Sequence, residues 1–369
     1  MGGAAQLLGE TGMIGWLRSH WDRFRGAGEE AVTVPPMDGA LRPDQRLETA
    51  PLRARIARPD NLVSLGGQIL CSSGAEILRL DPESGGATPF LSLPAEVTAL
   101  AASDDGRLAI GIESGGVLLR DRAGGLSALE ERALSCPVAL LWGGETLFIA
   151  NGSAAAHPSD WKRDLMRRGA SGSLHEWKGG RLTLLQEGLA WPYGLAMTPE
   201  GLVWSESWRH RLCLRGTDGR IRTMLGDLPG YPARLSPAAQ GGFWLSLFAP
   251  RSQLVEFILR EPVFRDRMIA EIDAAHWAAP SLTPSHTFLE PLQGGAQKHL
   301  GQLKPWAPTR SYGLVLRLDA QFHPVESFHS RADGARHGVT SVLGMEEGRA
   351  LAAAKGGDVI VELVEEVLP

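Results

Sequence analysis

The stretch Leu195–Trp204 reads LAMTPEGLVW, two short apolar runs on either side of the turn Pro199-Glu200-Gly201. Val97–Ile112 repeats the arrangement, with VTALA and LAIGI flanking an Asp-Asp-Gly turn. A third kind of run alternates apolar and charged residues, as in Ile77–Asp81 (ILRLD) and Leu314–Asp319 (LVLRLD). Short apolar runs joined by tight turns predict antiparallel sheets of four strands.

The units recur along the chain. We expect their inner strands to begin near residues 60, 97, 136, 193, 234 and 340, which gives three intervals of 37, 39 and 41 residues. Propeller blades repeat every ~40–50 residues. The two longer intervals contain predicted helices at Pro158–Arg168 and Pro262–Ala275. Six starts predict an all-β fold, a six-bladed β-propeller.

The ends of the chain complete the predicted architecture. We assign residues 46–369 to the propeller, with a helical and irregular insertion at about 260–309 between the fifth and sixth blades. Arg46–Ala57 is expected to add the outer strand of the last blade, so that no sheet edge stays open. Residues 1–45 are assigned to an N-terminal helix, over about residues 6–25, and an extended connector. This helix is expected to pack outside the ring; a helix lying on a membrane surface is the alternative.

Composition excludes several classes of protein. The net charge is −5 with both signs interspersed, so the sequence predicts no nucleic-acid partner. The three cysteines, Cys71, Cys136 and Cys213, are far apart in the sequence, which argues against a disulfide framework or a zinc site. There is no run of 18 apolar residues to span a membrane, and no cationic segment typical of a secretory signal at the N-terminus. We therefore expect a cytoplasmic protein.

Several segments are more specific than a general propeller pattern. LPGYP at Leu228–Pro232 is followed by GFWL at Gly242–Leu245, and preceded by WPYGLA at Trp191–Ala196 and IANGS at Ile149–Ser153. In this order the segments resemble those of strictosidine-synthase-like proteins, over about residues 35–365. The resemblance implies a six-bladed propeller related to gluconolactonase- and paraoxonase-type lactonases.

In those lactonases a central calcium ion activates or polarises the substrate, held by carboxylate and Asn oxygens at the inner-strand starts. Calcium requires about six to eight such oxygen ligands. Of the four corresponding positions, Asp60 alone keeps a carboxylate; the others are Cys136, Tyr193 and Ala233-Arg234. We therefore predict no metal ligands and no cofactor. Arg234, a permanent cation, is expected to replace the charge of the metal and to pair with Asp60 across the channel.

The resemblance also implies a catalytic glutamate in the last blade, which plant strictosidine synthases use as an acid and base. The matching stretch His337–Ser341 reads HGVTS and contains no acid. The position of the glutamate falls on Ser341, or on Gly338 in an alternative alignment. Strictosidine synthesis itself is therefore not expected.

Side chains at one mouth of the channel form the candidate site. A carboxylate, a phenol, a guanidinium and an imidazole around a confined space can bind an anionic small molecule and move protons. A polar plug that fills the channel is the alternative. The insertion at 276–309 is expected to act as a lid or a binding loop. We predict catalytic roles for Asp60 and His337, and substrate-binding roles for Cys136, His157, Trp161, Tyr193, Arg234, Thr340 and Ser341.

Three functions remain open from the sequence. The first is a metal-independent enzyme that acts on a small organic molecule by proton transfer or by imine or lactone chemistry. The second is a non-catalytic propeller that binds a small molecule or a protein. The third, calcium-dependent lactone or ester hydrolysis, is opposed by the lost ligands. Because a fold alone does not determine a function, the choice depends on the geometry of the site.

Overall fold

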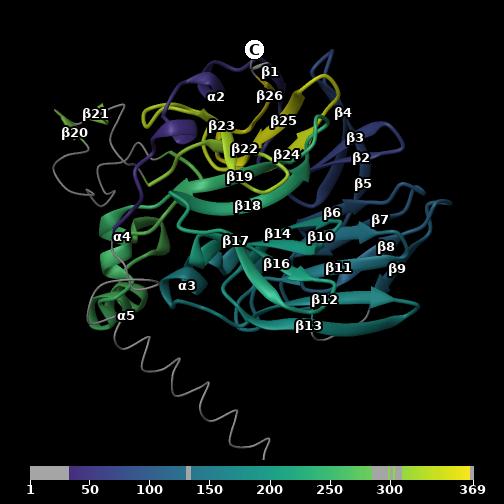
Figure 1. Ribbon diagram of the computed structural model, residues 1–369, viewed down its shortest axis with the longest axis horizontal. Helices are drawn as coiled ribbons and strands as arrows, with labels where there is room; N and C mark the ends of the chain where they lie inside the picture. Colours follow the sequence, from purple (N-terminus) through teal and green to yellow (C-terminus); the bar gives the residue numbers. More distant parts are fainter. Residues whose placement is uncertain (1–32, 130–133, 285–297, 300–301, 304–309, 366–369) are drawn as a thin grey trace, which may run out of the picture.

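The computed structural model describes residues 33–129, 134–284, 298–299, 302–303 and 310–365. Six antiparallel sheets of four strands make up its body (Figure 1). The inner strand of each sheet contacts the inner strands of both neighbouring sheets, so the six sheets form a closed ring. This confirms the predicted six-bladed β-propeller.

The first four blades each use four consecutive strands, ordered from the axis outward. Blade one contains β2 (Pro59–Leu65), β3 (Gln68–Ser73), β4 (Glu76–Asp81) and β5 (Gly86–Ser92). Blade two contains β6 (Val97–Ala102), β7 (Leu108–Ile112), β8 (Val117–Arg120) and β9 (Leu126–Leu129). Blade three contains β10 (Pro137–Gly143), β11 (Thr146–Asn151), β12 (Gly172–Lys178) and β13 (Arg181–Leu189). Blade four contains β14 (Pro192–Thr198), β15 (Gly201–Glu206), β16 (Arg211–Gly216) and β17 (Ile221–Leu225).

The last two blades depart from this order. Blade five contains β18 (Gly230–Pro237), β19 (Phe243–Pro250), β22 (Leu314–Leu318) and β23 (Pro324–His329). Blade six contains β24 (Val339–Gly344), β25 (Arg349–Ala354), β26 (Val359–Val364) and, from the other end of the chain, β1 (Leu52–Arg55). The insertion therefore lies inside blade five, between β19 and β22, which corrects its predicted place between blades five and six. The antiparallel pairing of β1 with β26 confirms the predicted closure of the ring.

All six inner strands begin within four residues of the predicted positions, at Pro59, Val97, Pro137, Pro192, Gly230 and Val339. The apolar runs are recognisable because the strands near the axis are buried on both faces, as in β19, where every residue is buried. Outer strands such as β5 and β17 are largely exposed. One cluster of buried apolar side chains fills each of the six interfaces between blades. Burial between blades thus stabilises the ring.

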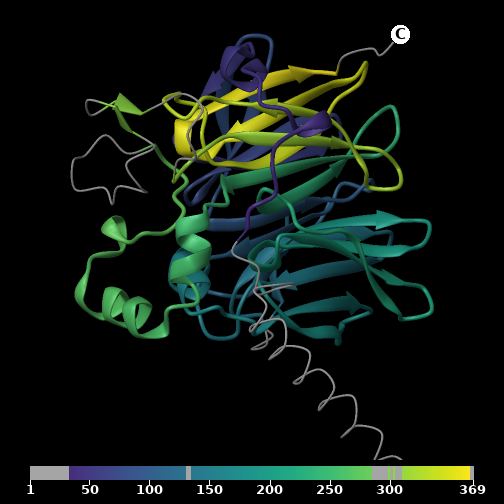
Figure 2. The ribbon, with the colours of Figure 1, turned by 60° about the vertical axis from the view of Figure 1, so that its left-hand side comes forward.

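Short helices gather on one side of the ring (Figure 1 and Figure 2). They include the predicted helix of blade three, as η3 (Pro158–Asp160) and α3 (Trp161–Met166), and α4 (Gln253–Ile258), α5 (Pro262–Glu271) and η5 (Ala274–His276) of the insertion. The buried faces of α3, α4 and α5 share one cluster with Tyr231 and Phe248 of blade five. The remaining short elements are η2 (Gly39–Leu41), α2 (Arg46–Thr49), η4 (Ser207–Arg209), β20 (Lys298–His299), β21 (Gln302–Leu303) and η6 (Lys355–Gly357).

Two sequence predictions concern residues that the structure does not describe. The N-terminal helix at about residues 6–25 lies outside the described residues, and so does most of the predicted lid at 276–309. Of the helices that the structure describes, none has the length and apolar character needed to cross a membrane.

Candidate functional site

Backbone bulges mark the start of four inner strands. In blades two, three, four and six, one residue is skipped in the pairing with the second strand: Thr98, Val138, Tyr193 and Thr340. A bulged residue is left out of the ladder of backbone hydrogen bonds. The carbonyl groups and side chains at these positions can therefore make other contacts at the axis.

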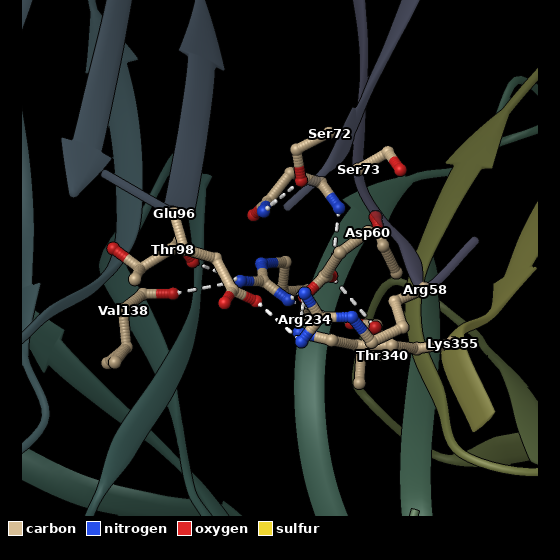
Figure 3. Close-up of polar contacts among 12 residues, drawn as sticks. Arg58, Asp60, Ser72, Ser73, Glu96, Thr98, Val138, Arg234, Thr340 and Lys355 are labelled. Carbon is tan, nitrogen blue, oxygen red and sulfur yellow. Dashed lines mark hydrogen bonds and ion pairs between the residues drawn. The ribbon is translucent and has the colours of Figure 1, made fainter. Parts of the chain in front are cut away.

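Arg234, on β18 of blade five, uses three of these carbonyl groups. Its Nη1 donates to Oδ1 of Asp60 at 2.7 Å and to the Thr340 carbonyl at 3.3 Å. Its Nη2 donates to the carbonyls of Thr98, at 2.7 Å, and Val138, at 3.1 Å. Figure 3 shows the guanidinium at the centre of these groups. The predicted pair of Arg234 with Asp60 is therefore present in the structure.

The Arg234 side chain also contacts blade four, which its hydrogen bonds do not reach. The guanidinium carbon of Arg234 lies 4.8 Å from the centre of the Tyr193 ring in blade four, a cation–π contact. Together with the hydrogen bonds above, this means that one arginine contacts all six blades. Its side chain is only 12% exposed. The positive charge on the axis of the propeller is therefore the charge of an arginine side chain.

The Asp60 carboxylate balances the charge of the Arg234 guanidinium. It also binds a second cation, the Lys355 ammonium. Lys355 follows β25, and its Nζ lies 3.0 Å from Oδ2 of Asp60. Oδ1 also accepts from the Thr340 hydroxyl and from the Asn61 backbone, both at 2.8 Å. Burial works to raise the pKa of Asp60, but the charges of Arg234 and Lys355 outweigh it and lower this pKa to about 2. Burial likewise opposes the charge of Lys355, but the Asp60 carboxylate outweighs it and raises the pKa of the lysine.

Calcium does not fit this centre. One carboxylate and three carbonyl oxygens are suitable ligands for calcium, but the Arg234 guanidinium already lies among them at hydrogen-bonding distance. A second cation a few ångströms away would cost several kcal/mol at an effective dielectric constant of about 20. Elsewhere among the described residues, no group of three or more His, Cys, Asp and Glu side chains could hold a metal ion.

A cavity of about 250 Å³ lies beside this centre, at the mouth of the channel. Asp60 and Lys355 contribute to its polar wall. Much of the remaining wall is aromatic, formed by Trp161, Trp191, Tyr193, Trp208 and Phe248. Apolar walls with a few convergent polar groups are typical of small-molecule sites.

The aromatic wall is built by contacts among its own rings. Trp208, on η4, is stacked on Trp191 with ring centres 5.3 Å apart. Phe248 contacts Trp161 and Tyr193 edge to face, at 5.4 and 5.9 Å. Such pairs stabilise one another beyond simple burial. The wall is therefore a fixed surface suited to a flat apolar ligand.

Two further carboxylates line the cavity, and both come from blade two. Glu96 pairs with Arg58 at 3.2 Å. Glu113 accepts a hydrogen bond from the backbone of Ser159 at 3.0 Å, which fixes its carboxylate next to the start of η3. The cavity thus combines both signs of charge with an aromatic wall.

The structure brings together five of the nine predicted site residues. Asp60, Trp161 and Tyr193 line the cavity, while Arg234 and Thr340 hold Asp60.

The other four predicted residues do not line this cavity. The buried His337 ring is held by the Ser311 hydroxyl and the Arg331 carbonyl. Cys136 is buried beside Trp191, and burial raises the pKa of its thiol to about 12. The Ser341 hydroxyl accepts from the Leu62 backbone. His157 is exposed and precedes η3.

Sequence reasoning missed Lys355, Glu96 and Glu113. Lys355 precedes Gly356-Gly357, a pair that reads as a simple hairpin turn. The two glutamates flank the strands β6 and β7, where charged residues are common in turns. None of the three belongs to a motif, so only their shared place at strand ends around one mouth of the channel could have suggested them.

Among the comparisons with known proteins, the one with solved structures supports the fold. No family model matches the chain, and no curated protein matches it. Among solved structures, a gluconolactonase from Xanthomonas campestris is 13% identical with a TM-score of 0.53, and the match covers 85% of this chain and 87% of that one. A calcium-binding protein, regucalcin, from Agrobacterium tumefaciens is 14% identical with a TM-score of 0.50, over 85% of this chain and 94% of that one. At these identities, the similarity shows that the chain shares the six-bladed propeller fold of gluconolactonase- and regucalcin-type proteins.

Proposed function

We propose that this chain is a metal-independent enzyme that hydrolyses a lactone or an ester of a small organic molecule. One observation carries the proposal: the Lys355 ammonium lines an aromatic cavity and is held by Asp60, which the Arg234 guanidinium also binds on the axis. The substrate would present a flat apolar body to the tryptophans and a carbonyl group to Lys355.

Lys355 would bind the negative charge that develops on the carbonyl oxygen. A preorganised cation in a site that excludes water stabilises such an oxyanion far more than it would in bulk water. The raised pKa keeps Lys355 protonated at neutral pH, so it is a donor and not the amine nucleophile that imine formation would need. This favours acyl hydrolysis over imine chemistry.

Glu113 would accept the proton of the attacking water. It lines the cavity, and its carboxylate is fixed by the Ser159 backbone. Asp60 is a poor base because its pKa is lowered to about 2. We therefore assign Asp60 and Arg234 as positioning residues, which hold Lys355 at the cavity.

Two sources support the reaction class without identifying the substrate. The names of the structural neighbours include gluconolactonase, and the LPGYP and GFW segments resemble strictosidine-synthase-like proteins. As part of the proposal, we infer that this chain is related to strictosidine-synthase-like proteins and, through them, to gluconolactonase- and paraoxonase-type lactonases. The non-catalytic alternative predicts the same cavity, but it requires no role for Glu113.

The test is a screen of lactones, with gluconolactone included, and aryl esters on the full chain in the presence of a chelator. Lys355→Met should lower kcat by about a hundredfold or more with a smaller change in KM, as expected for the loss of one oxyanion donor. Glu113→Gln should lower kcat by a similar factor, on the scale of general base catalysis.

Lys178→Met is the matched control, because Lys178 is an exposed lysine in a hairpin of blade three. It should leave kcat and KM unchanged. Thermal denaturation of each variant separates a loss of activity from a loss of fold. Activity that needs added calcium, or that survives in both Lys355→Met and Glu113→Gln, would overturn the proposal.

A further inference from the structure

Trp208 is the ring around which the aromatic wall of the cavity is organised. Its ring centre lies 5.3 Å from that of Trp191, 6.0 Å from that of Tyr231, and 6.3 Å from those of Trp161 and Phe248. Trp191, Tyr231 and Phe248 are buried, whereas Trp208 is half-buried and lines the cavity. The plane of the Trp208 ring therefore sets the shape of the wall that a ligand meets.

The orientation of this ring is fixed by Asp164 of α3. Nε1 of Trp208 donates to Oδ1 of Asp164 at 2.8 Å, and Asp164 is only 6% exposed. Because the indole carries a single N–H in its ring plane, a bond to a buried acceptor restricts the rotation of the whole ring. Asp164 follows Trp161 by three residues in the same helix. Helix α3 thus supplies one ring of the wall and the acceptor that orients another.

The Asp164 carboxylate is itself held from a second side. Its Oδ2 accepts from the hydroxyl of Ser153 at 2.8 Å. Ser153 is fully buried, and its hydroxyl lies 3.1 Å from that of Ser171. It is also the last residue of the IANGS segment in the sequence. Both carboxylate oxygens therefore have a donor, one from the wall and one from the loop after β11.

Gly169 shows how closely the chain is built around this carboxylate. The backbone N–H of Gly169 donates to the Asp164 carbonyl at 2.9 Å. A Cβ at position 169 would collide with both carboxylate oxygens of Asp164. Glycine permits such a close approach because it has no side chain. A larger residue would therefore displace the carboxylate or the segment that carries residue 169.

The backbone next to the Trp208 ring is also constrained. Trp191, on which Trp208 is stacked, has a φ of 58°, in the left-handed region that bulky residues rarely adopt. The Trp191 carbonyl accepts from the Ser207 N–H at 3.0 Å, and the Ala190 carbonyl accepts from the Trp208 N–H at 3.2 Å. Strained residues of this kind persist where the surroundings over-determine them, and they gather at ligand sites.

We infer that Asp164 is a positioning residue, which orients Trp208 so that the cavity prefers substrates with a flat aromatic body to aliphatic ones. A ring held in place offers its face to an aromatic ligand, and a preorganised surface binds with a smaller loss of entropy. The inference rests on the proposed function for its kinetic test. Binding of an aromatic probe tests it without any reaction.

Three variants separate the hydrogen bond from the charge of the carboxylate. Asp164→Leu removes the acceptor of the Trp208 indole, whereas Asp164→Asn keeps an acceptor and removes the charge. Trp208→Phe keeps an aromatic ring and removes the indole N–H. Asp160→Leu is the matched control, because Asp160 is an exposed aspartate that directly precedes the same helix.

Calorimetry with indole as the probe measures binding to the full chain. We expect indole to bind at a single site, and Asp164→Leu to weaken its binding about tenfold, the effect of losing one well-oriented aromatic contact. Asp164→Asn and Asp160→Leu should bind indole as the natural chain does. In a Trp208→Phe chain, Asp164→Leu should have no further effect, because the hydrogen bond is already absent.

NMR of the chain labelled with ¹⁵N in its indole groups observes the hydrogen bond itself. The Trp208 signal is assigned by its loss in Trp208→Phe. It should exchange slowly with solvent in the natural chain and in Asp164→Asn, and faster in Asp164→Leu. A role of Asp164 in folding alone would not separate these two variants.

The kinetic test compares coumarin, a flat aromatic lactone, with the aliphatic γ-butyrolactone. Asp164→Leu should raise the KM of coumarin about tenfold with a smaller change in kcat, the opposite of the result expected for Lys355→Met. Its kcat/KM for γ-butyrolactone should be unchanged. The preference for the aromatic substrate should therefore fall.

The outcomes separate this inference from the proposed function. Unchanged indole affinity in Asp164→Leu, an equal loss in Asp164→Asn or Asp160→Leu, or a natural chain that hydrolyses aliphatic lactones without binding indole refutes the inference alone. Indole binding that depends on Asp164 in a chain that hydrolyses no lactone or ester refutes the proposed function alone. A chain that neither binds indole nor hydrolyses these compounds refutes both. If Asp164→Leu folds poorly, Gly169→Ala, which crowds the same carboxylate, takes its place in each comparison.

Discussion

Asp60 accepts hydrogen bonds from two cations, Arg234 and Lys355, in a position where its side chain is only 4% exposed. Removing one partner from such a buried group leaves an uncompensated charge, which costs about 3–5 kcal/mol. The carboxylate therefore matters both for the stability of the fold and for the position of Lys355. It links the axis of the ring to the wall of the cavity.

The pH dependence of stability gives a test at this scale. The pKa of Asp60 is lowered from 3.8 to about 2 in the folded chain, so its ionised form stabilises the fold above about pH 4, and this stabilisation is lost as the pH falls toward 2. The pH-dependent part amounts to about 2 kcal/mol. In urea unfolding, Asp60→Asn should be less stable than the natural chain at pH 6, and the difference should shrink between pH 4 and pH 2. Asp218→Asn, at an exposed turn, should show a small difference. A difference for Asp60→Asn that stays constant from pH 6 to pH 2 would contradict this.

Single residues also show what the sequence could reveal about the site. Arg234 could be placed because the PGYP segment fixes the register of blade five just before it, and Asp60 because it stands at the start of the first inner strand. The carbonyls of Thr98 and Val138 could not, since every residue carries a carbonyl and only the bulges expose these two. The position of His337 before the last inner strand predicts a place at the mouth of the channel. Its ring is instead bonded to Ser311 and the Arg331 backbone.

At the scale of elements, β1 closes the ring by pairing with β26, some 300 residues later in the chain. Arg53 of β1 adds an ion pair with Glu362 of β26 at 2.9 Å. Ala54 and Ile56 contribute to the apolar cluster between blades six and one. The strand pattern predicted this closure, because an open propeller would leave a sheet edge unpaired. It could not show in which loop of blade five the insertion lies, because spacing alone does not separate loops within a blade from loops between blades.

Truncation tests the role of β1. A chain that begins at residue 59 lacks the strand and its ion pair, and exposes the edge of β26. Its melting temperature should fall by roughly 5 °C or more, since each 1 kcal/mol shifts the midpoint of a chain of this size by about 2 °C, and it should aggregate at lower concentration. A chain that begins at residue 33 keeps β1 and is the control. Equal melting of the two truncated chains would show that β1 is not needed to hold the ring.

At the scale of the whole molecule, one guanidinium joins the six blades at their common axis. Contacts with blades one, two, three and six are hydrogen bonds, the contact with blade four is through the Tyr193 ring, and blade five carries the arginine itself. The bulges at the inner-strand starts of blades two, three and six direct their carbonyls to this point, where these groups need a hydrogen-bond donor. In this chain Arg234 supplies it.

The central claim is therefore that Arg234 replaces a metal ion, and calcium calorimetry on the unmodified chain tests it most directly. The chain is first treated with a chelator and dialysed, and calcium is then titrated into it at neutral pH. Two cations cannot share the oxygens around Asp60 without a cost of several kcal/mol at an effective dielectric constant of about 20. The account predicts heats equal to those of dilution. Binding of one calcium ion per chain with micromolar affinity would contradict it.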